Sequence, residues 1–213
     1  MTAPQRRRTA APKSAERMRK ADRKRQLLGR AKQLFVTLGY QHTTTEKIAK
    51  AAGVSEPVLY RHFESKKALF LEVLREVRDA TVNRWKAETA DLTDPLTKLH
   101  AIADSYLGTT REHALEFRIM HRTLIECDDP EIASLLRSFY LDSEALLAQV
   151  ISEGQQTGVF RRSLDPRVGA WELIRTALGY TLTLPLGVPL YAEPDYIPRA
   201  VECLLNCLLK TDV

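Results

Sequence analysis

The sequence lacks an apolar run long enough to cross a membrane, and it has few cysteines. Its apolar stretches all fall short of the roughly 20 residues that a spanning helix needs. The basic N-terminus has no apolar segment behind it, which argues against a secretory signal. The three cysteines, Cys127, Cys203 and Cys207, are odd in number and lack the spacing of a zinc site. We therefore expect no bound metal, no membrane association and a reducing, cytoplasmic setting.

Motifs that carry out catalysis are also missing. The chain has no Gly-rich phosphate loop, no G-x-S-x-G, no H-E-x-x-H and no C-x-x-C. Its scattered serines, histidines and aspartates reflect composition and do not indicate a triad. His100, His121 and the run Cys127-Asp128-Asp129 do not form a convincing set of metal ligands. We expect a protein that is not an enzyme and that has no cofactor.

What the sequence does contain is helical patterning along most of its 213 residues. Apolar side chains recur at steps of three and four, and no segment shows sustained two-residue alternation. Composition is ordinary for a globular protein, with 44% hydrophobic and 28% charged residues. These features predict an all-α fold without internal repeats.

Charge divides the chain into two unlike parts. Residues 1–75 carry 18 lysines and arginines against 6 acidic residues, a net charge of +12, whereas residues 76–213 carry 14 against 21, a net charge of −7. Residues 1–21 contain almost no large apolar side chains, which predicts a disordered basic arm. We therefore expect this arm, then a small domain over 22–75 that meets a polyanion, and a larger helical domain over 76–213.

Short helices separated by tight turns are predicted within residues 22–75. The first helix should end at Gly39, and Thr43 with Glu46 resembles a capping box that starts the second helix near Thr44 or Thr45. Gly53 ends that helix, and Ser55 can cap a third helix with Pro57 in its first turn. Helix, tight turn and helix is the arrangement that places a helix in the DNA major groove.

The same residues resemble the DNA-binding domain of the TetR family of bacterial transcriptional regulators over about 22–75. A dozen positions agree in type and spacing: Gly39-Tyr40, Thr44-Thr45, Ile48-Ala49, Ala52-Gly53-Val54-Ser55, Leu59-Tyr60, His62-Phe63, Lys66 and Leu69. The resemblance implies a homodimer that binds a palindromic operator in double-stranded DNA. It also implies a C-terminal cavity whose unidentified small-molecule effector weakens DNA binding, as in a repressor. A regulator that needs no ligand, or one that activates, remains the alternative.

The resemblance assigns DNA-contacting roles to particular residues. Thr44, Thr45, Tyr60, His62 and Lys66 are expected at phosphates, where hydroxyls and positive charge are favourable. The outward residues of the recognition helix are Ser55, Glu56, Pro57 and Val58. Pro57 and Val58 could contact a thymine methyl, and Glu56 could accept from a cytosine amino group or could simply cap the helix.

In the C-terminal domain, aromatic and Met side chains between the long helices are candidates for a ligand site for an apolar or amphipathic molecule. They are Trp85, Tyr106, Phe117, Met120, His121, Phe139 and Tyr140. Such residues are more often plain core. The last two helices carry apolar residues on more than one side, which favours dimerisation through Trp171, Ile174, Leu178, Val201, Leu204, Leu205 and Leu208. An intrachain core would also explain part of this set.

A nucleoid-like DNA binder that uses only the basic arm is a further alternative. The acidic balance of residues 76–213 argues against it, because such a protein gains from positive charge throughout.

Overall fold

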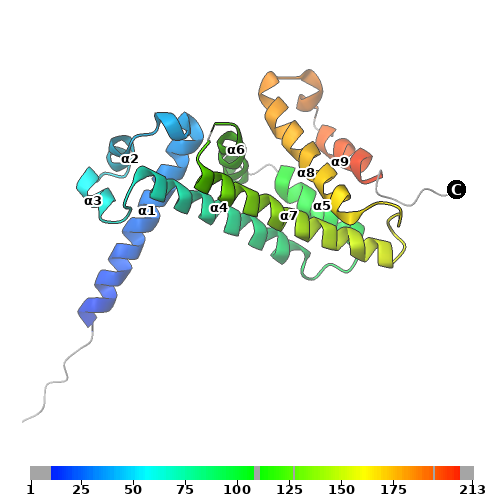
Figure 1. The fold of residues 1–213 in the computed structure, drawn as a ribbon, viewed down its shortest axis with the longest axis horizontal. Coiled ribbons are helices and arrows are strands. Elements are labelled where there is room, and N and C mark those ends of the chain that lie inside the picture. The colour runs from blue at the N-terminus through cyan, green and yellow to red at the C-terminus, as the bar shows by residue number, and fades with distance from the viewer. Residues whose placement is uncertain (1–10, 108–110, 127, 194, 207–213) are drawn as a thin grey trace, which may run out of the picture. The chain divides into compact units, whose positions relative to one another are not determined.

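The structure, a computed structural model, describes residues 11–107, 111–126, 128–193 and 195–206 (Figure 1). These residues form helices and connecting turns and contain no strand, which confirms the predicted all-α fold. The chain divides into two compact units, Met1–Val73 and Leu74–Val213, and each is described separately below. Within the described ranges, no helix has both the length and the apolar character needed to span a bilayer.

Three helices and the first turns of a fourth make up the N-terminal unit. They are α1 (Ala11–His42), α2 (Thr45–Ala51), α3 (Glu56–Tyr60) and the start of α4 (Lys66–Thr89). Leu27, Phe35, Ile48, Leu59 and Phe70 are almost fully buried and form its core. Phe35 meets Phe70 edge to face, with ring centroids 4.6 Å apart. These contacts fix the short helices, which would not be stable alone.

The helix α1 begins earlier than the sequence led us to expect. It starts at Ala11, so residues 11–21 of the predicted disordered arm are helical, and this part of the prediction is wrong. The reason is that Ala, Lys, Arg, Met and Glu, which dominate this stretch, are strong helix formers even without apolar contacts. The rest of the predicted arm, residues 1–10, lies outside the described residues.

Local signals place the turns of this unit. Gly39 interrupts α1 with φ 82°, and Gly53 turns the chain between α2 and α3 with φ 66°, a region that suits glycine. The residue that caps α2 is Thr44, whose hydroxyl accepts from Lys47 N, and not Thr43 as the capping-box pattern suggested. Thr43 is instead buried and donates to the Gly39 carbonyl, so its hydroxyl stabilises the preceding turn.

The C-terminal unit contains the rest of α4 and five further helices. These are α5 (Pro95–Leu107), α6 (Arg111–Glu126), α7 (Pro130–Gln156), α8 (Pro166–Thr183) and α9 (Tyr196–Asn206), with short 3₁₀ turns η1 (Leu184–Leu186) and η2 (Pro189–Ala192) between the last two. Asp129 and Asp165 cap α7 and α8, each followed by a proline at the first helical position. The α7 helix packs along α8 and α5, and α9 packs against α5.

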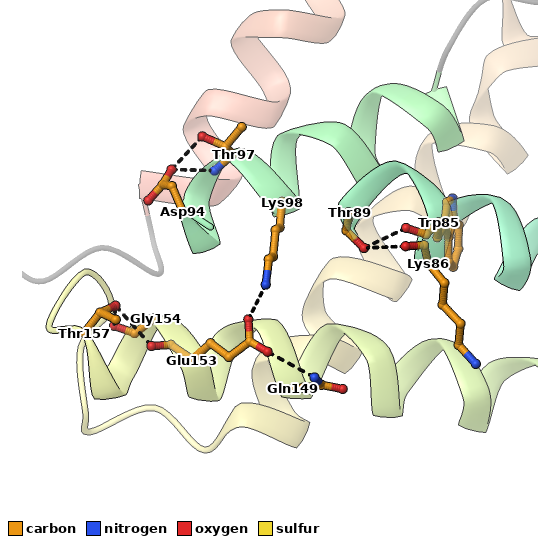
Figure 2. Close-up of polar contacts among 10 residues, drawn as sticks. All are labelled: Trp85, Lys86, Thr89, Asp94, Thr97, Lys98, Gln149, Glu153, Gly154 and Thr157. Carbon is orange, nitrogen blue, oxygen red and sulfur yellow. Dashed lines mark hydrogen bonds and ion pairs between the residues drawn. The ribbon is translucent and has the colours of Figure 1, made fainter. Parts of the chain in front are cut away.

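Polar contacts tie α5 to α7 at one end of this unit (Figure 2). Lys98 Nζ donates to Glu153 Oε2 at 2.6 Å, and Gln149 donates to the other oxygen of the same carboxylate at 3.0 Å. These two donors hold the pKa of Glu153 below its ordinary value. At the start of α5, Asp94 accepts from the backbone N–H and the hydroxyl of Thr97 and caps the helix.

Close packing occurs where α7 ends. The ring of Phe160 lies against Gly154, where an added Cβ would come within 2.0 Å of the ring. Phe160 is almost completely buried, so this contact folds the loop after α7 back onto the helix.

Candidate DNA interface and ligand cavity

The helix-turn-helix positions its outward residues by burying their neighbours. Leu59 on α3 and Phe63 just after it are buried, which leaves the opposite side of α3 toward solvent. Pro57 is exposed there, and Glu56 and Val58 are partly exposed. Ser55 stands at the N-cap of α3, but its side chain makes no capping hydrogen bond. This exposed side of a short, rigidly held helix has the geometry needed to enter a major groove.

Two of the residues predicted to contact phosphate lie together at the surface. Thr45 Oγ1 and Tyr60 Oη are 3.2 Å apart, so the hydroxyls at the start of α2 and the end of α3 form a pair. Tyr60 remains 49% exposed, and Thr44 next to this pair is also exposed. The start of α2 thus presents hydroxyls and N–H groups, which can bind an anion.

Lys66 has a structural partner that the sequence pattern did not predict. Its Nζ donates to the Tyr40 carbonyl at 2.9 Å and lies 4.3 Å from the centroid of the Tyr40 ring. The lysine therefore joins the start of α4 to the end of α1. One ammonium group has three N–H donors, so this bond leaves donors for another acceptor.

His62 lies in a basic environment. Its pKa is lowered first by burial and then by the positive charges of Lys20, Arg61, Lys24 and Arg23. Sequence reasoning had placed Lys20 in a disordered arm and had given no role to Arg23 or Lys24. All three lie on α1. The helix-forming composition of this basic stretch is the signal that could have identified them. As part of one helix, these residues bring their positive charge close to His62.

The C-terminal unit contains a cavity of about 130 Å³. Residues of α4 to α9 line it, and nearly all of them are apolar or aromatic. Of the seven predicted ligand residues, five line the cavity: Trp85, Tyr106, His121, Phe139 and Tyr140. Phe117 and Met120 are buried behind it, with Phe117 stacked on Trp85 at 6.3 Å between centroids. Sequence reasoning missed Ser143, Tyr180 and Tyr196, because their positions depend on how α7, α8 and α9 meet.

Most residues predicted for a dimer interface also line this cavity. They are Ile174, Leu178, Val201, Leu204 and Leu205. Trp171 is only partly buried and donates through Nε1 to Glu144 Oε2 at 3.0 Å. Leu208 lies outside the described residues. Intrachain packing thus explains part of this set, but Leu178 and Leu204 stay partly exposed, and the dimer interface remains a prediction.

Two polar residues that line the cavity, Tyr106 and His121, are hydrogen-bonded to each other. Tyr106 Oη lies 3.2 Å from His121 Nε2 and 3.1 Å from Thr181 Oγ1. Burial lowers the pKa of His121 to about 4, so the ring is neutral at pH 7. Burial also raises the pKa values of Tyr106 and Tyr140 above the ordinary range, which keeps both phenols protonated. A cavity of this kind, apolar with a few enclosed polar groups, is the usual form of a small-molecule site.

The chain combines a surface helix-turn-helix in one helical unit with an apolar cavity in the other. This combination is typical of the class of DNA-binding regulators. The sequence profile described as "Bacterial regulatory proteins, tetR family" matches residues 27–73. The nucleoid occlusion factor SlmA of Vibrio atlanticus is 32% identical over 168 residues, covering 68% of this chain and 85% of that protein. The chain belongs to the TetR family.

One further relative and one solved structure are also similar to this chain. The HTH-type transcriptional activator FasR of Mycolicibacterium smegmatis is 34% identical over 104 residues, covering 49% of this chain. The chain spans 48%, about half, of the length of FasR. A transcriptional regulator from Saccharomonospora viridis, solved in complex with choline, shares the fold with a TM-score of 0.79 at 24% identity, covering 89% of this chain and 99% of the other.

Proposed function

We propose that this protein is a dimeric, sequence-specific regulator that represses transcription from a palindromic operator and is released by a small apolar or amphipathic ligand. The observation that carries this proposal is the presence, in one chain, of an exposed helix-turn-helix surface with basic surroundings and an apolar cavity in a separate unit. Repression follows if the operator overlaps a promoter. Activation is the alternative, and the relative FasR bears the name of an activator.

The DNA contacts proposed here rest on exposure and charge. Thr44, Thr45 and Tyr60 would bind phosphates through hydroxyls, and His62 and Lys66 through positive charge or N–H groups. Pro57 and Val58 would meet base edges, and Ser55 and Glu56 would lie at the groove end of the same helix. A protein with this arrangement reads sequence through α3 and gains affinity from α1, α2 and the start of α4.

A second copy would supply the second recognition helix. The side of α8 that faces away from the cavity carries Val168, Gly179 and Leu182 in one stripe. Val168 is 51% exposed and Leu182 is 47% exposed, and a Cβ added to Gly179 would meet no atom within 4 Å. The exposed Glu172 and Arg175 lie on the same side of α8 and pair with each other, so this surface is mixed rather than apolar. We propose that the dimer forms through α8 and α9, the helices that carry the residues first assigned to the interface.

Release by a ligand would require two arrangements of the dimer that differ in ligand affinity. A coupling of about 1–3 kcal/mol is typical of such regulators. The helix α4 is the proposed connection, because Lys66 lies at its start and Trp85, on the same helix, lines the cavity.

Selection of bound fragments from genomic DNA by the full chain tests the proposal. We expect enrichment of one palindrome with half-sites one or more helical turns apart, bound at least about 1,000-fold more tightly than random DNA. Sedimentation of the complex should show two or more chains on each site. Fragments without a shared palindrome, or one chain per site, would contradict the proposal.

The relationship to SlmA gives a specific reason to test one other function, that of a nucleoid-associated DNA binder. The same selection separates the two. Such a protein would enrich many sites across the chromosome with no relation to promoters, whereas a regulator would enrich a few promoter-proximal sites. The replacement Val58→Ala should shift the preferred sequence in a regulator, because Val58 is placed at base edges.

A further inference from the structure

The face of α1 that covers the core of the N-terminal unit becomes basic toward the start of the helix. Leu27 and Ala31 are fully buried one turn apart, and Lys24 and Lys20 continue the same three- and four-residue steps toward the N-terminus. Residues spaced in this way lie on one face of a helix. No residue from 20 to 26 is buried, so this face has no core left to cover. Figure 1 shows the first turns of α1 extending beyond α2 and α3.

Contacts with the rest of the unit fix the place of this basic stretch beside the helix-turn-helix. Lys24 Nζ lies 5.6 Å from the centroid of the Phe63 ring and 2.5 Å from Glu72 Oε1. Gln26 Nε2 donates to the Ala52 carbonyl at 3.4 Å, at the turn between α2 and α3. This part of α1 is therefore held at a defined position next to α3 before any DNA binds.

Three cations at this junction have no carboxylate partner. Lys20 and Arg23 on α1 and Arg61 just after α3 are exposed, and within the described ranges they make no ion pair. The neighbouring Lys24 differs, because it pairs with Glu72. Like charges held close together repel each other, so such a cluster lowers stability unless an anion binds to it.

The surroundings of His62 show that these cations converge on one place. Burial lowers the pKa of this histidine most, and the positive charges of Lys20, Arg61, Lys24 and Arg23 lower it further. Charges at a protein surface act on one another only over about 10 Å at ordinary salt concentration. Because His62 directly follows the end of α3, the cluster borders the helix that is proposed to meet base edges.

We propose that Lys20, Arg23 and Arg61 form a second phosphate-binding surface, which contacts the DNA backbone beside the groove that α3 enters. We call this surface the α1–α3 cluster. The inference rests on the proposed function, since it adds contacts to the proposed DNA interface. A duplex is the partner that fits, because it presents several phosphates in a row and can neutralise all three cations at once, whereas a single carboxylate would neutralise one.

The salt dependence of DNA binding by the full chain counts these contacts. Lys20→Ala/Arg23→Ala should lower the slope of log affinity against log salt concentration by about two, since each lost phosphate contact removes about 0.9. Adding Arg61→Ala should bring the total loss to about three. Fluorescence anisotropy with a labelled duplex of about 30 base pairs, between about 50 and 300 mM salt, measures the slope.

A second double variant provides the matched control. Arg25→Ala/Arg75→Ala also removes two exposed arginines, but neither is among the charges that act on His62. Its slope should stay within about 0.5 of the native slope. All variants replace exposed side chains, so the midpoint of thermal unfolding should stay within about 2 °C of the native value.

Two duplexes keep this test separate from the proposed function. One is the operator obtained by fragment selection, and the other is a random duplex of the same length. Phosphate contacts do not depend on sequence, so Lys20→Ala/Arg23→Ala should lower the slope on both and change the ratio of the two affinities by less than about 3-fold. If selection yields no palindrome, the proposed function fails, and the random duplex still tests the α1–α3 cluster.

Hydroxyl-radical footprinting on the operator locates the contacts. The native chain should protect a stretch of backbone in each half-site that Lys20→Ala/Arg23→Ala leaves open, while the rest of the footprint is retained. Several outcomes would overturn the inference. They are an unchanged salt slope on both duplexes, an equal loss of slope in Arg25→Ala/Arg75→Ala, or a footprint identical to that of the native chain.

Discussion

The exposed surface of the N-terminal unit and the interior of the C-terminal unit differ in how their polar side chains are paired. In the N-terminal unit, polar groups at the surface are paired in short contacts, such as Thr45 with Tyr60 and Lys66 with the Tyr40 carbonyl. In the C-terminal unit, Trp85, His121 and Tyr140 keep enclosed polar atoms unpaired. A surface that meets a polyanion benefits from groups already held in position, because water satisfies them until DNA arrives. The enclosed atoms of the C-terminal unit are out of reach of water, so each one that stays unpaired lowers the stability of the fold.

The largest effect on the C-terminal unit should come from disturbing the packing at the end of α7. Gly154→Ala should lower the free energy of unfolding by about 3 kcal/mol, because the new methyl group would overlap the Phe160 ring. Urea unfolding followed by tryptophan fluorescence measures this in the C-terminal unit, since both tryptophans, Trp85 and Trp171, lie there. Gly29→Ala, in α1 with open space around it, is the control and should not lower stability. A loss under about 1 kcal/mol for Gly154→Ala would contradict the packing.

A smaller effect should come from the enclosed histidine as pH falls. The pKa of His121 is about 4 in the folded chain, below the ordinary value of 6.5, so below pH 6.5 the unfolded chain binds a proton that the folded chain does not. Its contribution to stability is therefore constant above pH 6.5 and decreases between pH 6.5 and 4. We expect a loss of about 1.4 kcal/mol between pH 7.5 and pH 5.5 from this residue.

Urea unfolding at the two pH values, compared between the native chain and His121→Phe, isolates that contribution. The variant should lose about 1.4 kcal/mol less than the native chain over this range. Tyr140→Phe removes a hydroxyl from the same cavity but no group that titrates here, and it should keep the native pH dependence. Identical pH dependence in His121→Phe and the native chain would show that the histidine is not enclosed as described.

The smallest expected effect concerns Lys66 in the N-terminal unit. Lys66→Ala should lower the slope of log affinity against log salt concentration by about one, because one phosphate contact is lost. It should also reduce stability by about 1 kcal/mol through loss of the bond to Tyr40. Salt titration of operator binding measures the first effect, and thermal unfolding measures the second.

The exposed Lys86, in the C-terminal part of α4, provides the matched control, and Lys86→Ala should change neither quantity. Lower stability with an unchanged salt slope in Lys66→Ala would mean that the lysine serves only to join α4 to α1. The positive charge of Lys66 would then stabilise the fold of the N-terminal unit without contributing to DNA binding.

Local features of the sequence predicted most helix boundaries correctly. Asp165-Pro166 starts α8 and Gly53 ends α2, because capping and positive φ depend on neighbouring residues alone. The start of α1 was the exception. There, helix propensity outweighed the absence of apolar residues, which we had taken as a sign of disorder.

The sequence by itself determined the helical fold, the basic N-terminal unit and the helix-turn-helix, because periodicity, caps and charge are written along the chain. Tertiary structure alone decided which apolar residues of α8 and α9 line the cavity, since an apolar helix face does not specify what covers it. It also decided the partner of Lys66, which lies 26 positions away in the sequence. The hydrogen bonds of Tyr106 Oη with His121 Nε2 and Thr181 Oγ1 depend in the same way on three helices meeting at one point.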